Sequence, residues 1–353
     1  MHRTRVVRFT LLLLIASISF NWACSSALAA EASPSSIPKL SRPEADKGPT
    51  KVSTAVWLLD VDSIDSSAQS FIANAFIVLN WKDPRLAHGD TMPMTFDVDK
   101  IWTPRIQITN EIGIVRRTFP EIVDVDPDGT VTYRQRFVGP FSQPMGLNDF
   151  PFDRHEFRLH LVSPGSGPEE IQFMRDQGWI DAGLPKAAGI AEDISLPDWT
   201  IEGYDAFPEP YIVAPGVKVA GFAFDFVAKR DVQHYVWKVI LPLLLIVMMS
   251  WSVFWIDPAN AGTQIAVATT TMLTLIAYRF AIDTQVPKVP YMTKMDQFIV
   301  VGTILVFLTL MQVVITARLS QLGRETLARR IDRKSRWIFP MLFVVGLTLA
   351  LVE

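Results

Sequence analysis

Residues Ala261 to Asp283 read AGTQIAVATTTMLTLIAYRFAID, an apolar run of membrane-spanning length. At ~1.5 Å per residue such a helix measures roughly 34 Å, which exceeds the ~30 Å hydrocarbon core of a bilayer. Small, hydroxylated and apolar residues recur at alternating steps of four and three, so they share one face. These residues are Ala266, Thr270, Leu273, Ala277 and Phe280 or Ala281. This face suits the lining of a water-filled path, but it equally suits close packing between membrane helices.

The rest of the composition narrows the class of protein. The 353 residues are 49% apolar and 20% charged, and the apolar residues gather at the two ends of the chain. The formal net charge is only −3, which argues against nucleic acid as a partner. The sequence contains no phosphate-binding glycine loop, no nucleophile elbow and no His pair at metal-ligand spacing. We therefore expect no cofactor, no metal site and no enzymatic activity.

Residues 1–30 have the pattern of a cleavable secretory signal. Arginines precede an apolar run, and small residues ending at Ala29 and Ala30 follow it. Cys24, the one cysteine of the chain, lies inside this segment, and a lipoprotein site at Cys24 is the less favoured alternative. Residues 31–51 are rich in Pro, Ser, Ala and charge and predict a flexible leader.

Residues 52–230 predict an antiparallel β-sandwich, because short runs rich in Val, Ile, Phe and Thr alternate with Pro, Gly and Asp clusters. Asp128 and Gly129 lie between Val125 and Val131 and predict a two-residue hairpin. The expected strands are 73–81, 113–119, 130–137, 156–162, 199–204 and 221–228.

Residues 231–353 predict a transmembrane domain of four helices. The apolar stretches lie near 232–256, 261–283, 295–317 and 337–352. The segment from Arg318 to Arg336 carries seven Arg or Lys residues against Glu325 and Asp332. By the positive-inside rule this segment is cytoplasmic, and counting the spans back from it places the β domain outside, in agreement with the signal sequence.

The segment Leu147 to Phe157, LNDFPFDRHEF, resembles the pentameric ligand-gated ion channels, the Cys-loop receptor family. Members of that family carry an aromatic-Pro-Phe-Asp motif, which Phe150, Pro151, Phe152 and Asp153 match. The two cysteines that name the loop would fall at Gln143 and Phe157. Their absence is shared with prokaryotic members of the family.

The resemblance covers almost the whole mature chain. The matching motifs are Trp81 to Leu86, Ile101 to Pro104, Arg230, Pro242 and Pro287 to Thr293. They imply a multi-domain membrane protein that forms a homopentamer, with an N-terminal extracellular β-sandwich followed by a four-helix transmembrane bundle. They further imply an integral protein of a bacterial inner membrane with a periplasmic N-terminal domain.

The resemblance makes the helix at 261–283 the pore lining, extended by Thr284. Leu273 is the expected gate, because an apolar constriction closes a pore by dewetting. Its alternative is a leucine packed between helices. The charges near the pore mouths are Asp257, Asp283 and Arg279, and they weakly favour cations. Asp257 also suits a helix cap before a first-turn proline, and Arg279 suits a pair with Asp283.

Coupling between the domains is expected at a buried ion pair of Asp153 with Arg230. The other expected coupling residues are Phe152, Pro151, Pro287 and Pro290. The alternative is that these residues are ordinary interface residues that hold the two domains together.

The agonist site that the resemblance implies lies between subunits. Its expected residues are Phe76, Thr109, Phe207 and Tyr211. Thr109 replaces an aromatic residue, so a box for a quaternary ammonium group is doubtful. The sequence therefore predicts a ligand-gated channel subunit whose partners are membrane lipid, a small-molecule agonist or protons, and small monovalent ions. Proton gating, anion selectivity and a non-conducting periplasmic sensor are the alternatives.

Overall fold

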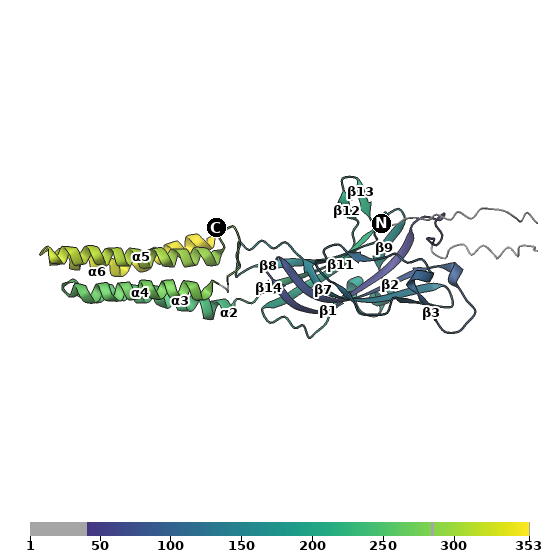
Figure 1. Cartoon of the computed structure of the whole chain (residues 1–353), viewed down its shortest axis with the longest axis horizontal. Coiled ribbons are helices and arrows are strands. Elements are labelled where there is room, and N and C mark those ends of the chain that lie inside the picture. The colour runs from purple at the N-terminus through teal and green to yellow at the C-terminus, as the bar shows by residue number, and fades with distance from the viewer. Residues whose placement is uncertain (1–40, 284–285, 353) are drawn as a thin grey trace, which may run out of the picture.

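The computed structural model describes residues 41–283 and 286–352 of the chain. The predicted signal sequence at 1–30 lies outside the described residues. A β-rich half and a helical half occupy opposite ends of an elongated molecule (Figure 1). The two halves correspond to the two domains that the sequence predicts.

Two sheets face one another in the β-rich half. The larger sheet has the order β10 (Ala188–Ile190), β1 (Thr50–Asp65), β2 (Ser70–Lys82), β7 (Thr130–Ser142), β6 (Ile122–Val125) and β3 (Met94–Asp97), with β5 (Arg116–Arg117) on β7 and β9 (Ile171–Arg175) on β1. The smaller sheet has the order β11 (Trp199–Pro208), β14 (Gly221–Arg230), β8 (Arg154–Val162) and β4 (Gln107–Ile108). A separate hairpin joins β12 (Tyr211–Ala214) to β13 (Val217–Val219).

Phenylalanines from both sheets form the centre of the sandwich core. The ring of Phe71 on β2 lies 5.6 Å from Phe141 on β7, 5.3 Å from Phe157 on β8 and 5.7 Å from Phe226 on β14. Exposed and buried residues alternate along β7, as a strand with one buried face requires. Fully buried aromatic rings supply much of the apolar area that stabilises a fold without disulfides.

Three local predictions for this half need correction. The strand expected at 113–119 is reduced to the two residues of β5. The hairpin between β6 and β7 is present, but its loop is longer than two residues, because the Asp126 N–H donates to the Thr130 carbonyl and the Gly129 N–H to the Asp126 carbonyl. The end of the expected leader is a turn, in which Arg42 Nη1 donates to the Gly48 carbonyl at 2.6 Å.

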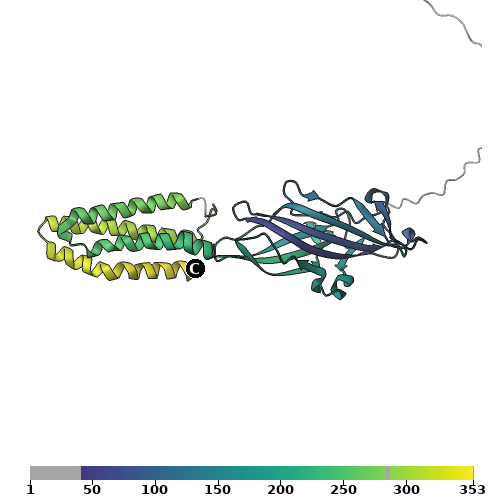
Figure 2. The same ribbon diagram turned by 90° about the horizontal axis from the view of Figure 1, so that it is seen from below.

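The helical half contains four helices in an antiparallel bundle (Figure 2). The first is built from α2 (Gln233–Tyr235), the π-helical segment η4 (Val236–Ile240), α3 (Leu241–Trp251) and η5 (Ser252–Trp255). The short helix η6 (Pro258–Asn260) leads into α4 (Ala261–Ile282), which is followed by α5 (Lys294–Gln321) and α6 (Glu325–Val352). Within the described residues, three helices are long and apolar enough to cross a membrane: 233–255, 258–282 and 294–321.

The ends of the helices have local causes. Pro242 lacks a backbone N–H and crowds the carbonyl four residues earlier, and the π-helical turn at η4 accommodates it. Thr293 and Asp296 form a capping box that starts α5.

The segment 318–336, expected as a linker, is helical except for a short turn between Gln321 and Glu325. This turn interrupts the arginine-rich segment and lies at the end of the bundle far from the β domain (Figure 2).

Candidate functional site

The helix α4 presents two different faces. Gln264, Ala268, Thr271, Leu275 and Ile282 are buried against the bundle of the same chain. The residues expected to line a pore lie on the other side and are exposed in the single chain: Ala266, Thr270, Leu273, Ala277, Phe280 and Ala281. Leu273 is 61% exposed and Phe280 is 79% exposed. Thr284 lies outside the described residues.

Two exposed threonines on α4 donate hydrogen bonds to their own helix, as the buried Thr271 also does. Thr270 Oγ1 donates to the Ala266 carbonyl at 2.8 Å, and Thr274 Oγ1 donates to the Thr270 carbonyl at 2.8 Å. Each hydroxyl oxygen keeps its lone pairs free for a further partner, because its hydrogen is already used. The exposed face of α4 therefore combines oxygen acceptors at one level with apolar side chains at others.

Asp257 is the helix cap that the sequence offered as an alternative, whereas Asp283 has a different partner from the one expected. Asp257 accepts a hydrogen bond from the Ala259 N–H at 3.0 Å and caps η6, while Arg329 Nη2 lies 3.2 Å from its carboxylate. Asp283 pairs with Lys288 at 3.1 Å, so its expected pair with Arg279 is wrong. The turn after α4 brings Lys288 back beside Asp283, which sequence spacing along a helix could not show.

Asp153 and Arg230 form the ion pair expected between the domains. Arg230 Nε donates to Asp153 Oδ1 and Nη2 to Oδ2, both at 2.8 Å. Asp153 is 3% exposed and Arg230 6% exposed. Arg230 Nη2 lies 2.7 Å from Ser66 Oγ, and His155 Nε2 lies 2.8 Å from Asp153 Oδ2. The pair is therefore buried and bidentate, with further polar partners on both sides.

Burial raises the pKa of Asp153, but the hydrogen bonds from Arg230 and His155 and the charge of Arg230 outweigh it and lower that pKa to about 2. Aromatic rings enclose the guanidinium: Trp199 at 4.1 Å, Phe150 at 4.9 Å and Tyr235 at 6.0 Å from its centre. Since Tyr235 belongs to α2 and Trp199 to β11, this cluster joins the sheets to the first helix of the bundle.

The loop that carries the aromatic-Pro-Phe-Asp motif also contacts the start of α5. The N–H groups of Lys294 and Met295 donate to the carbonyls of Asn148 and Phe150 at 2.9 and 3.1 Å. Lys294 Nζ lies 2.8 Å from Asp149 Oδ1.

The remaining coupling candidates lie around these contacts. Within the loop, Pro151 is buried and follows a cis peptide bond, whereas Phe152 is 46% exposed. Pro287 and Pro290 belong to the segment after α4, and the hydroxyl of Tyr291 in that segment accepts from the Leu147 N–H at 2.9 Å.

The expected ligand residues divide between two cavities. Thr109 and Tyr211 line a cavity of about 640 Å³ together with Glu156, Arg158 and His160. Phe76 lines a separate cavity of about 450 Å³. The single chain therefore does not bring the four expected residues into one site.

A charged side chain lies over one aromatic ring near the first of these cavities. The guanidinium of Arg158 lies 5.8 Å from the Phe207 ring centre and pairs with Asp225 at 2.6 Å and Glu209 at 2.8 Å. The ring of His160 lies edge-on to Tyr211 at 5.2 Å. Phe207 is thus already engaged with a cation of its own chain.

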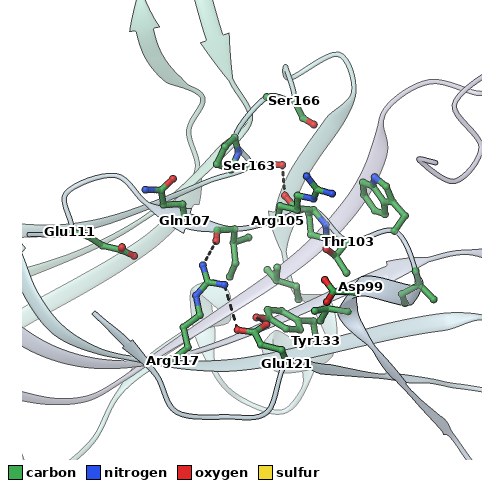
Figure 3. A pocket seen from close by; sticks show the side chains of 18 residues that line it. Asp99, Thr103, Arg105, Gln107, Glu111, Arg117, Glu121, Tyr133, Ser163 and Ser166 are labelled. Atoms are coloured by element: carbon green, nitrogen blue, oxygen red, sulfur yellow. Dashed lines mark hydrogen bonds and ion pairs between the residues drawn. The ribbon is translucent and has the colours of Figure 1, made fainter. Parts of the chain in front are cut away.

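A larger cavity of about 940 Å³ was not anticipated from the sequence. It lies between the segments 98–107 and 163–166 and the side chains of Arg117, Glu121 and Tyr133 (Figure 3). Arg117 donates to the Ile106 carbonyl at 3.0 Å, and the Tyr133 hydroxyl donates to Glu121 at 2.9 Å. Burial raises the pKa of Tyr133 to about 12, so the phenol stays protonated. The one sequence signal nearby is the motif at 101–104, which forms part of the wall.

Comparison with known proteins adds to this geometry. Residues 35–203 match the neurotransmitter-gated ion-channel ligand binding domain, and residues 239–326 match the neurotransmitter-gated ion-channel transmembrane region. A proton-gated ion channel of Gloeobacter violaceus is 29% identical over 311 residues, which are 86% of this chain and 83% of the relative.

Two animal receptor subunits are also similar. The gamma-aminobutyric acid receptor subunit beta-4 of Gallus gallus is 25% identical over 280 residues, 77% of this chain and 56% of that subunit. The beta-like subunit of Drosophila melanogaster is 25% identical over 290 residues, 77% of this chain and 57% of that subunit. The chain thus spans a little over half the length of these two relatives.

Proposed function

Because this chain belongs to the family of neurotransmitter-gated ion channels, we propose that it is one subunit of a homopentameric ligand-gated channel with α4 lining the pore. The chain is an integral membrane protein in which a β-rich domain precedes the helical transmembrane region. We place it in a bacterial inner membrane with the β domain in the periplasm. The arginine-rich segment 318–336, whose turn lies at the end of the bundle far from the β domain, supports this orientation.

The exposed face of α4 is the observation that carries the proposal. An α4 that served packing within the subunit would bury its stripe of small and hydroxylated residues. Instead the chain buries the opposite side, from Gln264 to Ile282, and leaves Thr270 and Leu273 uncovered. Five copies around an axis would place the exposed faces together around a central path.

Leu273 is the proposed gate and Thr270 the proposed polar ring. Five leucines at one level form an apolar constriction that excludes water when narrow, and the hydroxyl oxygens of Thr270 replace part of the hydration shell of an ion. We propose small monovalent cations as the permeant ions, on the basis of the exposed carboxylate of Asp283 at the outer end. Its exposed pair with Lys288 contributes only about 0–1 kcal/mol and leaves the carboxylate accessible.

The agonist is proposed to bind between neighbouring subunits. The cavity beside Tyr211 on one subunit and the cavity beside Phe76 on the next would form the two sides of this site. The exposed hairpin β12–β13 begins at Tyr211 and carries uncovered apolar side chains, including Ile212 and Val213. An apolar tip of this kind would be covered by an adjacent subunit or by bound agonist.

Protons are the second candidate agonist, and Glu156, which lines the cavity beside Tyr211, favours them. The hydrogen bond that Glu156 shares with Asp225, together with burial, raises the pKa of Glu156. As the pH falls, Glu156 therefore takes up a proton before an ordinary glutamate does. The similarity to a proton-gated channel supports the same candidate.

Reconstitution in planar bilayers tests the proposal. Currents would be recorded under asymmetric salt while the outer pH is stepped and small amines and amino acids are added. A gated current is expected, and its reversal potential identifies cations or anions. A protein that is pentameric by size but silent under every condition would leave the agonist open, whereas a silent monomer would contradict the channel itself.

A further inference from the structure

A buried carboxylate lies at the cytoplasmic end of the bundle. Asp332 on α6 is 2% exposed. Its Oδ2 accepts a hydrogen bond from Gln264 Nε2 of α4 at 3.1 Å, and its Oδ1 accepts one from Gln312 Nε2 of α5 at 3.2 Å. Ser335 Oγ donates to Gln312 Oε1 at 2.7 Å and completes the cluster. Asp332 therefore connects three helices, one of which is the proposed pore helix.

None of the ion pairs in residues 41–283 and 286–352 includes Asp332. The charged side chains that act electrostatically on Asp332 are Asp257 beside η6 and Arg336 on α6, whereas α4 and α5 contact it through neutral amides. Arg329 pairs with Asp257 at 3.2 Å. Arg336 donates to the Phe254 carbonyl at 3.0 Å. A buried carboxylate without a paired cation is costly in its charged form, so this site favours a bound proton.

The hydrogen bonds of the Gln264 amide show that the cluster around Asp332 has too few donors. Its Nε2 lies 2.9 Å from the Ile256 carbonyl, 3.4 Å from the Val253 carbonyl and 3.1 Å from Asp332, so two hydrogens face three acceptors. Its Oε1 is buried and accepts no hydrogen bond from any described residue. The cluster thus has an excess of acceptors, and a proton on Asp332 would add one donor.

We propose that Asp332 is a proton-binding group that couples the cytoplasmic pH to the inner end of α4. The inference goes beyond ligand gating from the outer side, although it rests on α4 as the pore helix. When Asp332 is ionised, its hydrogen bond from Gln264 is charge-assisted and holds α4 to α6. When it is protonated, that bond becomes a neutral one of about half the strength, so the inner end of α4 is held less tightly.

The test is to vary the cytoplasmic pH at constant outer pH, in inside-out patches that contain the full-length channel. In the parent protein we expect the ratio of open to closed channels to change by about fivefold as Asp332 takes up its proton, since roughly 1 kcal/mol separates the two kinds of hydrogen bond. Asp332→Asn is isosteric and cannot ionise, so its ratio should be constant. Glu325→Gln is the matched control, because Glu325 is an exposed carboxylate at the start of the same helix α6.

Three results would overturn the proposal: a parent channel indifferent to cytoplasmic pH, an Asp332→Asn channel with the parent's pH response, or a Glu325→Gln channel that loses the response. Infrared difference spectra of the purified pentamer supply a readout without current. A protonated-carboxyl band is expected in the parent protein and absent from Asp332→Asn, and its presence in both would refute the assignment. Absence of any current from the parent protein, together with an intact infrared difference, would contradict the proposed channel function rather than the proton site.

Discussion

Replacing Asp153 by Asn should destabilise the protein while leaving its shape unchanged. The substitution removes the negative charge that pairs with Arg230, and the guanidinium remains only 6% exposed. Breaking one partner of a buried ion pair costs about 3–5 kcal/mol. Ser66 and three aromatic rings still contact Arg230, and the Asn oxygen still accepts a hydrogen bond, so we expect a loss near the low end, about 3 kcal/mol.

The pH dependence gives a second estimate of the same interaction. The pKa of Asp153 is lowered from its ordinary value of 3.8 to about 2 in the folded protein. At ~1.4 kcal/mol per pKa unit this difference corresponds to about 2.5 kcal/mol. Because the folded-state pKa is lowered, the stabilisation is fully present above pH 4 and is lost as the pH falls from about 4 to about 2. Asp153→Asn should lack this part of the acid destabilisation.

The assay is loss of the assembled protein on heating, followed by size-exclusion chromatography in detergent. A loss of 3 kcal/mol corresponds to a fall of about 6–12 °C in the midpoint for a domain of this size. The control is Asp124→Asn, since Asp124 pairs with Arg134 at 2.7 Å in an exposed position and should change the midpoint by less than about 2 °C.

Channel opening in the Asp153→Asn variant distinguishes a coupling role of Asp153 from a purely structural one. If Asp153 couples agonist binding to the gate, Asp153→Asn channels will assemble but open poorly at saturating agonist. Equal midpoints for the Asp153 and Asp124 variants would refute the energetic reasoning, and a variant that fails to assemble would refute the coupling role.

Three further outcomes are expected. Leu273→Thr should raise the current without agonist about tenfold or more by wetting the constriction, which bilayer recording would measure, and a tightly closed variant would contradict the gate assignment. Tyr211→Ala and Phe76→Ala should each shift the agonist dose–response midpoint by about tenfold, and an unchanged midpoint in both would place the agonist elsewhere. Gly129→Ala should lower the thermal midpoint, since Gly129 has φ +82° and an added Cβ would lie 2.6 Å from the Asp83 carbonyl oxygen; an unaltered midpoint would show that the turn adapts.

Much of the architecture could be predicted because it follows from local composition. The membrane helices at 261–283 and 295–317 agree with α4 and α5 within a few residues, since the bilayer demands a long apolar run. The strands at 73–81 and 156–162 were equally clear from their β-branched and aromatic residues. The prediction of a linker at 318–336 is wrong, because most of this segment is helical. Its charges indicate a location in the cytoplasm but do not distinguish a helix from a loop.

Periodicity, hydrophobicity and the family motif can all be read along the chain, and they predict the two domains, the residues that share one face of α4 and the pairing of Asp153 with Arg230. These signals do not show which groups from distant segments meet. The folded structure pairs Asp283 with Lys288, forms the 940 Å³ cavity from several separate segments, and buries Asp332 between two amides. Such contacts depend on how helices and sheets pack, and no spacing within one segment specifies them.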